Sequence, residues 1–244
     1  MTEKQPGLIS RYSEHYRVTR SEHRPLPVLY PFAAITVLVI IAFLFLDPIA
    51  AGLYGRWPAW LANSAAHVTD VGRSWWILTL TAAIILGGWI MQRLSKSASV
   101  GRIATSATSM AVFILFSVGL AALIANIIKS AIGRPRPIMS GDNGLFSFHP
   151  FAWNYDFESF PSGHATVNGA LFMALALLFP RFRWPLLILG VCFAMTRVFV
   201  GAHFPSDVTA GFGFGMWFAF VAALLFSRIG VLFDTRDSKL AHKA

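Results

Sequence analysis

Two stretches of the sequence, PSGH at 161–164 and TRVFVGAHFPSD at 196–207, contain two histidines and an aspartate that could act on a phosphate. One imidazole can attack phosphorus, and a second can protonate the oxygen that leaves. Asp207 follows His203 by four residues and could hold one ring nitrogen so that the other faces the phosphate, as a triad carboxylate does. His203, His164 and Asp207 are therefore candidate catalytic residues.

Three cations and a hydroxyl could bind the phosphate itself. Guanidinium groups match phosphate oxygens in pairs, so Arg136 and Arg197, together with Lys129, are suited to an anion. Ser162 could cap the helix predicted to follow it, and the first N–H groups of a helix also favour an anion. These residues predict a phosphate-binding site.

The composition is that of a membrane protein. Of 244 residues, 56% are hydrophobic and 13% are charged, whereas soluble domains have about 25% charged residues. The net charge of +9 could suit nucleic acid or an anionic membrane surface, but the basic residues flank apolar segments and form no stripe, which excludes a nucleic-acid partner. A single cysteine, Cys192, excludes a disulfide within the chain and a cysteine metal site.

Six apolar segments are long enough to be membrane spans, each of which needs roughly 20 residues. The predicted fold class is all-α, a bundle of six transmembrane helices formed by residues 28–226, between an N-terminal segment (1–27) and a tail (227–244). The predicted spans are 28–46, 75–91, 110–128, 163–179, 184–200 and 208–226.

The distribution of lysine and arginine predicts the orientation. One set of segments, 1–27, 92–109, 180–183 and the tail, contains 14 of them, and the opposite side contains six. We therefore expect both termini in the cytoplasm. All the candidate site residues then lie at one depth near the opposite surface, and the sequence leaves open whether they meet laterally.

Three motifs in this order resemble those of the type 2 phosphatidic acid phosphatase (PAP2) family. KSAIGRPRP (129–137) resembles the first motif, PSGH the second, and TRVFVGAHFPSD the third. Thr196 stands where the family usually has serine, which keeps the hydroxyl. The motifs cover 129–207, and the six-span plan extends the resemblance over most of the chain.

The resemblance implies a role for each matching position. His203 would be the nucleophile that forms a phosphohistidine, Asp207 would orient it, and His164 would be the general acid and later the base. The residues that would hold the phosphate are Lys129, Arg136, Ser162, Gly163 and Arg197. The resemblance implies no metal and no cofactor, and a phosphorylated membrane lipid as substrate. In a bacterial inner membrane, the distribution of lysine and arginine predicts that this lipid is attacked on the periplasmic side.

The other polar residues near the motifs are expected to have structural roles or to be solvated. Arg134 lies outside the motif and best fits a lipid-headgroup anchor. His149, in the aromatic loop 146–157, is expected to have a structural or interfacial role, with substrate contact as the alternative. Asp70, Asp156 and Glu158 are expected to be solvated. GFGFG at 211–215 predicts close helix packing, since no strand precedes it as in nucleotide sites.

Alternatives to a phosphatase remain open from sequence. A phosphotransferase could discharge the same phosphohistidine onto a hydroxyl, and an anion transporter could bind phosphate without hydrolysis, although no duplicated halves are visible. The size and the aromatic loop most resemble the branch of the family that acts on lipid A 1-phosphate. Phosphatidylglycerophosphate, undecaprenyl diphosphate and phosphatidic acid are the other expected substrates, and the sequence does not predict the oligomeric state.

Overall fold

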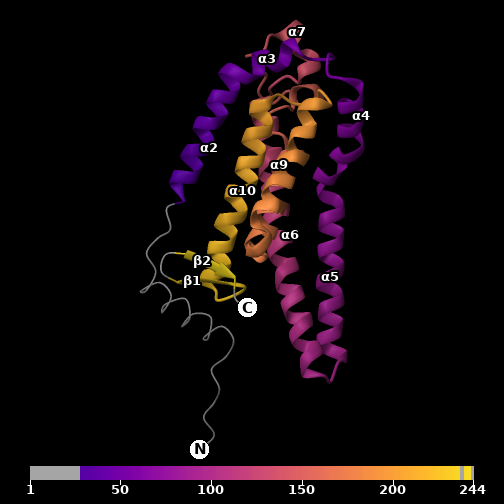
Figure 1. Cartoon of the computed structure of the whole chain (residues 1–244), viewed down its shortest axis with the longest axis vertical. Helices are drawn as coiled ribbons and strands as arrows, with labels where there is room; N and C mark the ends of the chain where they lie inside the picture. Colours follow the sequence, from indigo (N-terminus) through magenta and orange to yellow (C-terminus); the bar gives the residue numbers. More distant parts are fainter. Residues whose placement is uncertain (1–27, 237–238, 243–244) are drawn as a thin grey trace, which may run out of the picture.

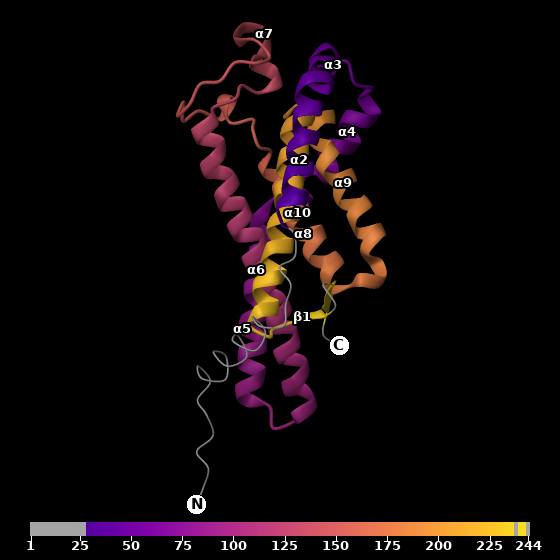
Figure 2. The same ribbon diagram turned by 90° about the vertical axis from the view of Figure 1, so that its left-hand side faces the viewer.

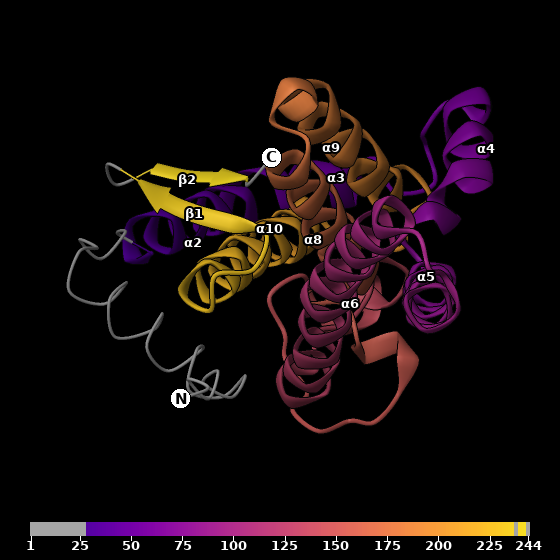
Figure 3. The same cartoon turned by 90° about the horizontal axis from the view of Figure 1, so that it is seen from below.

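Helix α8 (Gly163–Leu178) is the central element of the structure, a computed structural model that describes residues 28–236 and 239–242. It packs against α6 (Ala98–Ile132), α9 (Arg183–Phe199) and α10 (Pro205–Arg228), as the view along the bundle shows (Figure 3). Most of its residues are buried, including Asn168 and Thr166. The predicted N-terminal segment 1–27 lies outside the described residues.

The remaining elements surround this centre (Figure 1). Along the chain they are α2 (Leu29–Ile41), a π-helical segment η1 (Ala42–Leu46), α3 (Asp47–Gly52), α4 (Ala59–Val68), η2 (Thr69–Gly72), α5 (Ser74–Leu94), η3 (Pro137–Met139), α7 (Ser140–Asn143), η4 (Tyr155–Phe157), η5 (Pro180–Phe182) and the strands β1 (Phe233–Arg236) and β2 (Lys239–His242).

Each predicted span coincides with a helix, and the helical transmembrane class is confirmed. Five helical stretches are long and apolar enough to cross a membrane: Leu29–Gly52, Ala59–Leu94, Ala98–Met139, Pro180–Phe199 and Pro205–Arg228. The sixth, α8, has 16 residues, or about 24 Å at 1.5 Å per residue, which is shorter than a hydrocarbon core of about 30 Å. The count of six spans therefore stays a prediction.

Glycines let α8 and α10 approach closely. A Cβ atom at Gly211 would collide with the carbonyl of Ser162, one at Gly215 with the carbonyl of Thr166, and one at Gly169 with the carbonyl of Phe212. The expectation that GFGFG serves helix packing is confirmed. This contact joins the start of α8 to the start of α10, the two helix ends that contribute to the candidate site.

The tail contains an antiparallel hairpin that the sequence analysis did not predict. Strands β1 and β2 pair with Phe233 opposite His242 and Arg236 opposite Lys239. Phe233 is buried, with its ring 4.9 Å from that of Phe113 on α6. The hairpin therefore covers one end of the bundle, where Figure 1 shows it beside the end of α10.

The connections gather at two opposite ends of the bundle. The segment between α6 and α8 and the junction of α9 with α10 lie at one end, and the turn between α5 and α6 lies at the other (Figures 1 and 2). Every candidate site residue belongs to the first of these ends or to the helix turns next to it. The packing of the helices therefore brings these residues to one end of the bundle, and their common depth in a membrane stays a prediction.

Candidate active site

The loop that follows α6 is folded back onto the end of that helix. Gly133 ends the helix with φ of +63°, and a Cβ atom there would collide with the carbonyl of His149, so both its conformation and its surroundings require glycine. The N–H of His149 donates to the carbonyl of Gly133 at 2.7 Å, and that of Ser159 donates to the carbonyl of Arg134 at 3.0 Å. These bonds fix Arg134, Arg136 and Ser159 over the helix ends.

His203 lies in the tight link between α9 and α10. The carbonyl of Arg197 accepts the N–H groups of Ala202 and His203 at 3.0 and 3.2 Å. The ring is buried, and its Nδ1 lies 2.9 Å from the carbonyl oxygen of Ser159. Because a carbonyl can only accept, Nδ1 carries the proton and Nε2 keeps its lone pair. That Nε2 lies 3.5 Å from Nη1 of Arg136, so an anion bound to this guanidinium would lie next to the lone pair.

Asp207 acts on His203 less directly than the triad analogy predicts. Its Oδ2 lies 3.8 Å from Nδ1, which is longer than a hydrogen bond. That oxygen instead accepts the hydroxyl of Ser159 at 2.6 Å and the N–H of Phe204 at 2.9 Å. The two groups are therefore at an ion-pair distance, and the role of Asp207 in orienting the ring stays a prediction. Ser159 connects the two residues, because its hydroxyl donates to Asp207 and its carbonyl accepts from His203. The sequence did not predict a role for Ser159.

The electrostatic surroundings keep His203 neutral. Burial, followed by the positive charges of Arg136 and Arg197, lowers the pKa of His203 to about 4, and the carboxylate of Asp207 only partly opposes this shift. A neutral imidazole at physiological pH is the form that can attack phosphorus.

The predicted phosphate-binding cations converge around the start of α8. Arg136 is held by the carbonyls of Tyr155 (2.8 Å), Ala202 (3.1 Å) and Glu158 (3.3 Å), and its guanidinium stacks 3.8 Å from the centre of the Tyr155 ring. Lys129 approaches Gly163 so closely that a Cβ atom on that glycine would lie 3.3 Å from Nζ. Lys129 therefore borders the first turn of α8, and Arg136 lies beside His203.

Several buried polar atoms have no partner among the residues that the structure describes, and two of them are donors on predicted phosphate-binding residues. They are the Oγ of Ser162 and the Nε of Arg197, whose Nη1 donates to Thr69 at 2.9 Å. Ser162 occupies the N-cap position of α8, but its side chain does not cap the helix. The capping prediction is therefore wrong, and the hydroxyl stays available. Buried donors without a partner are costly, and a phosphate oxygen would satisfy them.

His164 lies in the first turn of α8, packed against η2. A Cβ atom at Gly72 would come within 2.9 Å of the Cβ of His164. The positive charges of Arg197, Arg73 and Lys129 act on the ring. The two candidate histidines thus border the same cluster of cations, and their roles in attack and protonation stay predictions.

Arg134 contradicts its interpretation as a headgroup anchor. It is fully buried and forms ion pairs with Asp207 (2.5 Å) and Asp47 (2.7 Å). The sequence analysis did not consider Asp47, although a carboxylate at the end of an apolar span signals a buried partner. Glu158 is also not simply solvated, because its Oε1 accepts the hydroxyl of Ser130 at 3.3 Å. Asp70 is exposed and pairs with Arg73, as expected for a solvated residue.

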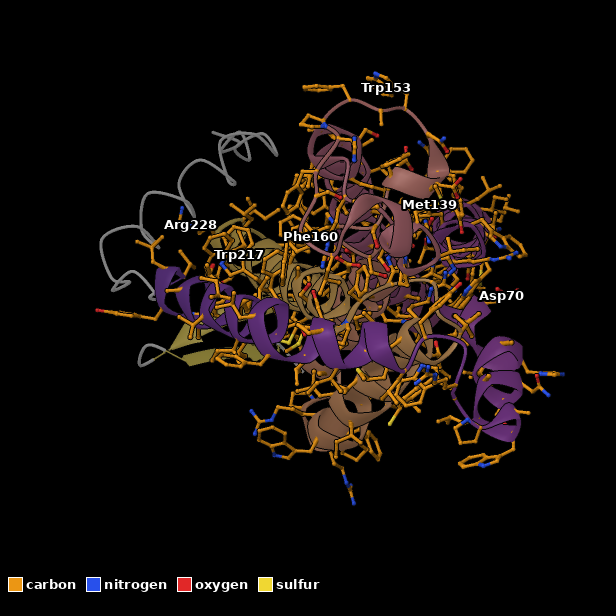
Figure 4. The ribbon with its side chains drawn as sticks, turned by 90° about the horizontal axis from the view of Figure 1, so that it is seen from above. Asp70, Met139, Trp153, Phe160, Trp217 and Arg228 are labelled. Atoms are coloured by element: carbon orange, nitrogen blue, oxygen red, sulfur yellow. The ribbon has the colours of Figure 1, made fainter. Side chains whose placement is uncertain are left out.

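The aromatic loop forms the rim of this end of the bundle. Figure 4 shows Trp153 at the edge, pointing away from the helices, and Phe160 closer to the middle. Trp153 is 76% exposed and Phe151 is 61% exposed, whereas the ring of His149 packs 4.6 Å from that of Phe157. The contact of His149 supports its structural role, and the exposed rings suit the headgroup level of a bilayer.

Comparisons with known proteins agree with this arrangement. The model of the PAP2 superfamily matches residues 110–230. The chain is 40% identical to the lipid A 1-phosphatase of Rhizobium johnstonii over 202 residues, which are 83% of this chain and 82% of that protein. The lipid A 1-phosphatase of Rhizobium etli is 39% identical over 83% of this chain and 86% of its own.

More distant proteins share part of the sequence or the fold. The undecaprenyl-diphosphatase BcrC of Bacillus subtilis is 37% identical over 37% of this chain and 45% of its own. The crystal structure of a transmembrane PAP2-type phosphatidylglycerolphosphate phosphatase from Bacillus subtilis superposes with a TM-score of 0.57 at 20% identity, covering 82% of this chain and 98% of that one. The chain therefore belongs to the PAP2 superfamily and is a multi-pass membrane lipid phosphatase.

Proposed function

We propose that the chain removes the 1-phosphate of lipid A, with His203 as nucleophile and His164 as proton donor and acceptor. The observation that carries this mechanism is the pair of unpartnered buried donors, on Ser162 and Arg197, beside a buried histidine whose Nε2 keeps its lone pair. The sequence resemblance predicted these roles, and the contacts of the site support them.

The first step transfers the phosphoryl group to the protein. Nε2 of His203 forms a bond to phosphorus while the bond from phosphorus to the lipid oxygen breaks. His164 gives its proton to that oxygen, so the dephosphorylated lipid leaves as an alcohol. The carbonyl of Ser159 keeps the proton of His203 on Nδ1, which directs attack through Nε2.

The second step returns the protein to its starting state. His164, now neutral, takes a proton from water, and the water oxygen forms a bond to phosphorus as the bond from phosphorus to Nε2 breaks. Inorganic phosphate leaves, His203 is neutral again and His164 is protonated. An acceptor hydroxyl in place of water would give the phosphotransferase alternative, and release of free phosphate distinguishes the two.

Fixed positive charge would stabilise both transition states. Lys129, Arg136 and Arg197 border the phosphate position, and the hydroxyl of Ser162 and the N–H groups beginning at Gly163 add neutral donors. We expect these groups to make a metal unnecessary. Activity that persists in excess chelator would support this expectation, and complete loss that Mg²⁺ restores would contradict it.

The choice of lipid A as substrate rests on the relatives. Two lipid A 1-phosphatases match over 83% of the chain, whereas the undecaprenyl-diphosphatases of Sulfolobus acidocaldarius and Bacillus subtilis match over 45% and 37% of it. The exposed aromatic rim is compatible with a large saccharide headgroup. We therefore rank lipid A first and undecaprenyl diphosphate second.

We also propose that the site faces the periplasm across a bacterial inner membrane. Support comes from the 14 cations in the segments assigned to the cytoplasmic side, against six on the other side. Three of those six, Lys129, Arg136 and Arg197, belong to the proposed phosphate site. Without them, the comparison is 14 cations on the cytoplasmic side against three on the other side.

A substrate comparison tests the proposal. The purified protein is incubated with lipid A, undecaprenyl diphosphate, phosphatidylglycerophosphate and phosphatidic acid in matched detergent micelles, and phosphate release and the lipid products are measured. We expect the highest kcat/KM for lipid A, with loss of the phosphate at position 1, and none with His203→Ala. A higher kcat/KM for any other lipid would overturn the substrate, and ordinary activity of His203→Ala would overturn the mechanism.

A further inference from the structure

Asp47 and Arg134 form a fully buried charge network with the beginning of α10. Arg134 donates from Nη1 to Asp207 at 2.5 Å and from Nη2 to Asp47 at 2.7 Å. The carboxylate of Asp47 also accepts the N–H of Ser206 at 2.9 Å and its hydroxyl at 2.5 Å. All four side chains are 0% exposed. Each oxygen of Asp47 therefore has a partner in Arg134 or in the first turn of α10.

This network determines the position of the carboxylate beside His203. Arg134 binds Oδ1 of Asp207, while Ser159 and the N–H of Phe204 bind Oδ2. Because both oxygens are fixed, the carboxylate cannot rotate away from the imidazole. The guanidinium of Arg134 in turn lies over the rings of Phe43 and Phe204, at 4.9 and 4.6 Å from their centres.

The charges of the network suggest why the second carboxylate is present. Arg134 and Asp207 alone would form a neutral pair, which would have little negative charge left to act on His203. Asp47 supplies a second negative charge to the same guanidinium, so two carboxylates and one cation leave a net charge of −1. In the buried surroundings of His203 such a charge is weakly screened.

Asp47 comes from a part of the chain that the family model does not include. It begins α3, directly after the first predicted span, whereas the match to the PAP2 superfamily covers residues 110–230. The distance in sequence from Asp47 to Arg134 is 87 residues. A residue of α3 thus contacts the residues that hold the site.

We propose that Asp47 and Arg134 are positioning residues, which fix Asp207 and preserve its negative charge for the reaction at His203. The inference rests on the proposed role of His203 as nucleophile. As Nε2 bonds to phosphorus, the ring, which keeps its Nδ1 proton, gains positive charge. The net negative charge of the network stabilises that positive charge, and it does so only while Asp47 offsets Arg134.

The test uses the full-length protein in detergent and a short-chain phosphatidic acid as substrate. The variants are Asp47→Asn, which leaves the network neutral, and the double variant Asp47→Asn/Arg134→Gln, which restores the net charge of −1. Ala42→Val is the packing control, because Ala42 is buried on the same helical stretch and has no charge. Thermal unfolding and gel filtration give the folded fraction of each, and His203→Ala tests the underlying mechanism.

We expect Asp47→Asn to lower kcat on the order of 10–100-fold per folded molecule, with KM changed less than about threefold, since the phosphate-binding groups are untouched. The double variant should recover at least severalfold of that loss, although it removes more native contacts. Ala42→Val should keep the wild-type kcat per folded molecule.

Two results would overturn the inference. One is a wild-type kcat for folded Asp47→Asn, and the other is a double variant no more active than the single one, which is what a purely structural role predicts. If instead His203→Ala kept ordinary activity, the proposed mechanism itself would fail. The two failures are therefore distinguishable.

Discussion

Ser159 contacts His203 and Asp207 with different atoms: its carbonyl accepts from Nδ1 of His203 at 2.9 Å, and its hydroxyl donates to Oδ2 of Asp207 at 2.6 Å. The carbonyl determines which ring nitrogen carries the proton. The hydroxyl binds the carboxylate whose charge acts on the ring. A substitution of the side chain removes the second contact and leaves the first.

Ser159→Ala should therefore lower kcat about tenfold with little change in KM, because Asp207 keeps the N–H of Phe204 and Arg134 but loses one charge-assisted bond. Steady-state phosphate release measures both constants. Ser140→Ala is the matched control, since that hydroxyl bonds the carbonyl of Pro137 within the same loop. Equal kinetics of Ser159→Ala and the control would contradict the proposed connection.

His203→Ala should reduce phosphate release to the background level, since phosphorus then has no nucleophile. Rapid quenching of the wild type with radiolabelled substrate should trap a phosphoprotein that is stable to alkali and labile to acid, as a phosphoramidate is. His164→Ala should still form it from lipids with good leaving groups, and should hydrolyse it slowly. A phosphoprotein that persists in His203→Ala would place the nucleophile elsewhere.

The pH profile should reflect the lowered pKa of His203. A pKa of about 4 means that the ring stays neutral until the pH falls near that value, so the acid limb of kcat/KM should lie near pH 4 and well below 6.5. Asp207 raises this pKa, so Asp207→Asn should move the limb to still lower pH as well as reduce the rate by about 10²–10⁴-fold. An acid limb at pH 6–7 that shifts upward in Asp207→Asn would refute the assignment.

The sequence predicted the helices and the motif residues because both signals are local. Apolar segments separated by charged links are recognisable without knowledge of packing, and the motifs fix the order of Lys129, His164 and His203. The burial of Arg134 depends on Asp207 and Asp47, which lie 73 and 87 residues away along the chain. Helix packing brings together residues that are this far apart in sequence, and it also determines the two contacts of Ser159.

The close approach of α8 and α10 should be sensitive to one methyl group. Gly211→Ala would drive a Cβ atom into the carbonyl of Ser162, which separates the starts of the two helices, and should lower both Tm and kcat. Gly87→Ala on α5 has open space around it and should be neutral or stabilising by up to about 1 kcal/mol through helix propensity. Thermal unfolding in detergent compares the two, and equal Tm values would contradict the packing argument.

The orientation of the bundle can be tested with single cysteines. Trp153, in the loop beside the site, is 76% exposed, and Phe182, in the turn between α8 and α9, is 56% exposed. Each is replaced by cysteine on a Cys192→Ser background, because the native thiol is also exposed. The excess of cations in the opposite segments predicts that Trp153→Cys reacts with an impermeant thiol reagent in intact spheroplasts, whereas Phe182→Cys reacts only after permeabilisation.

If this holds, a lipid made at the cytoplasmic face must cross the bilayer before Nε2 of His203 can reach its phosphate, and blocking that movement in cells should leave the substrate phosphorylated. Labelling of Phe182→Cys but not of Trp153→Cys in intact spheroplasts would reverse the orientation and place the site at the cytoplasmic face.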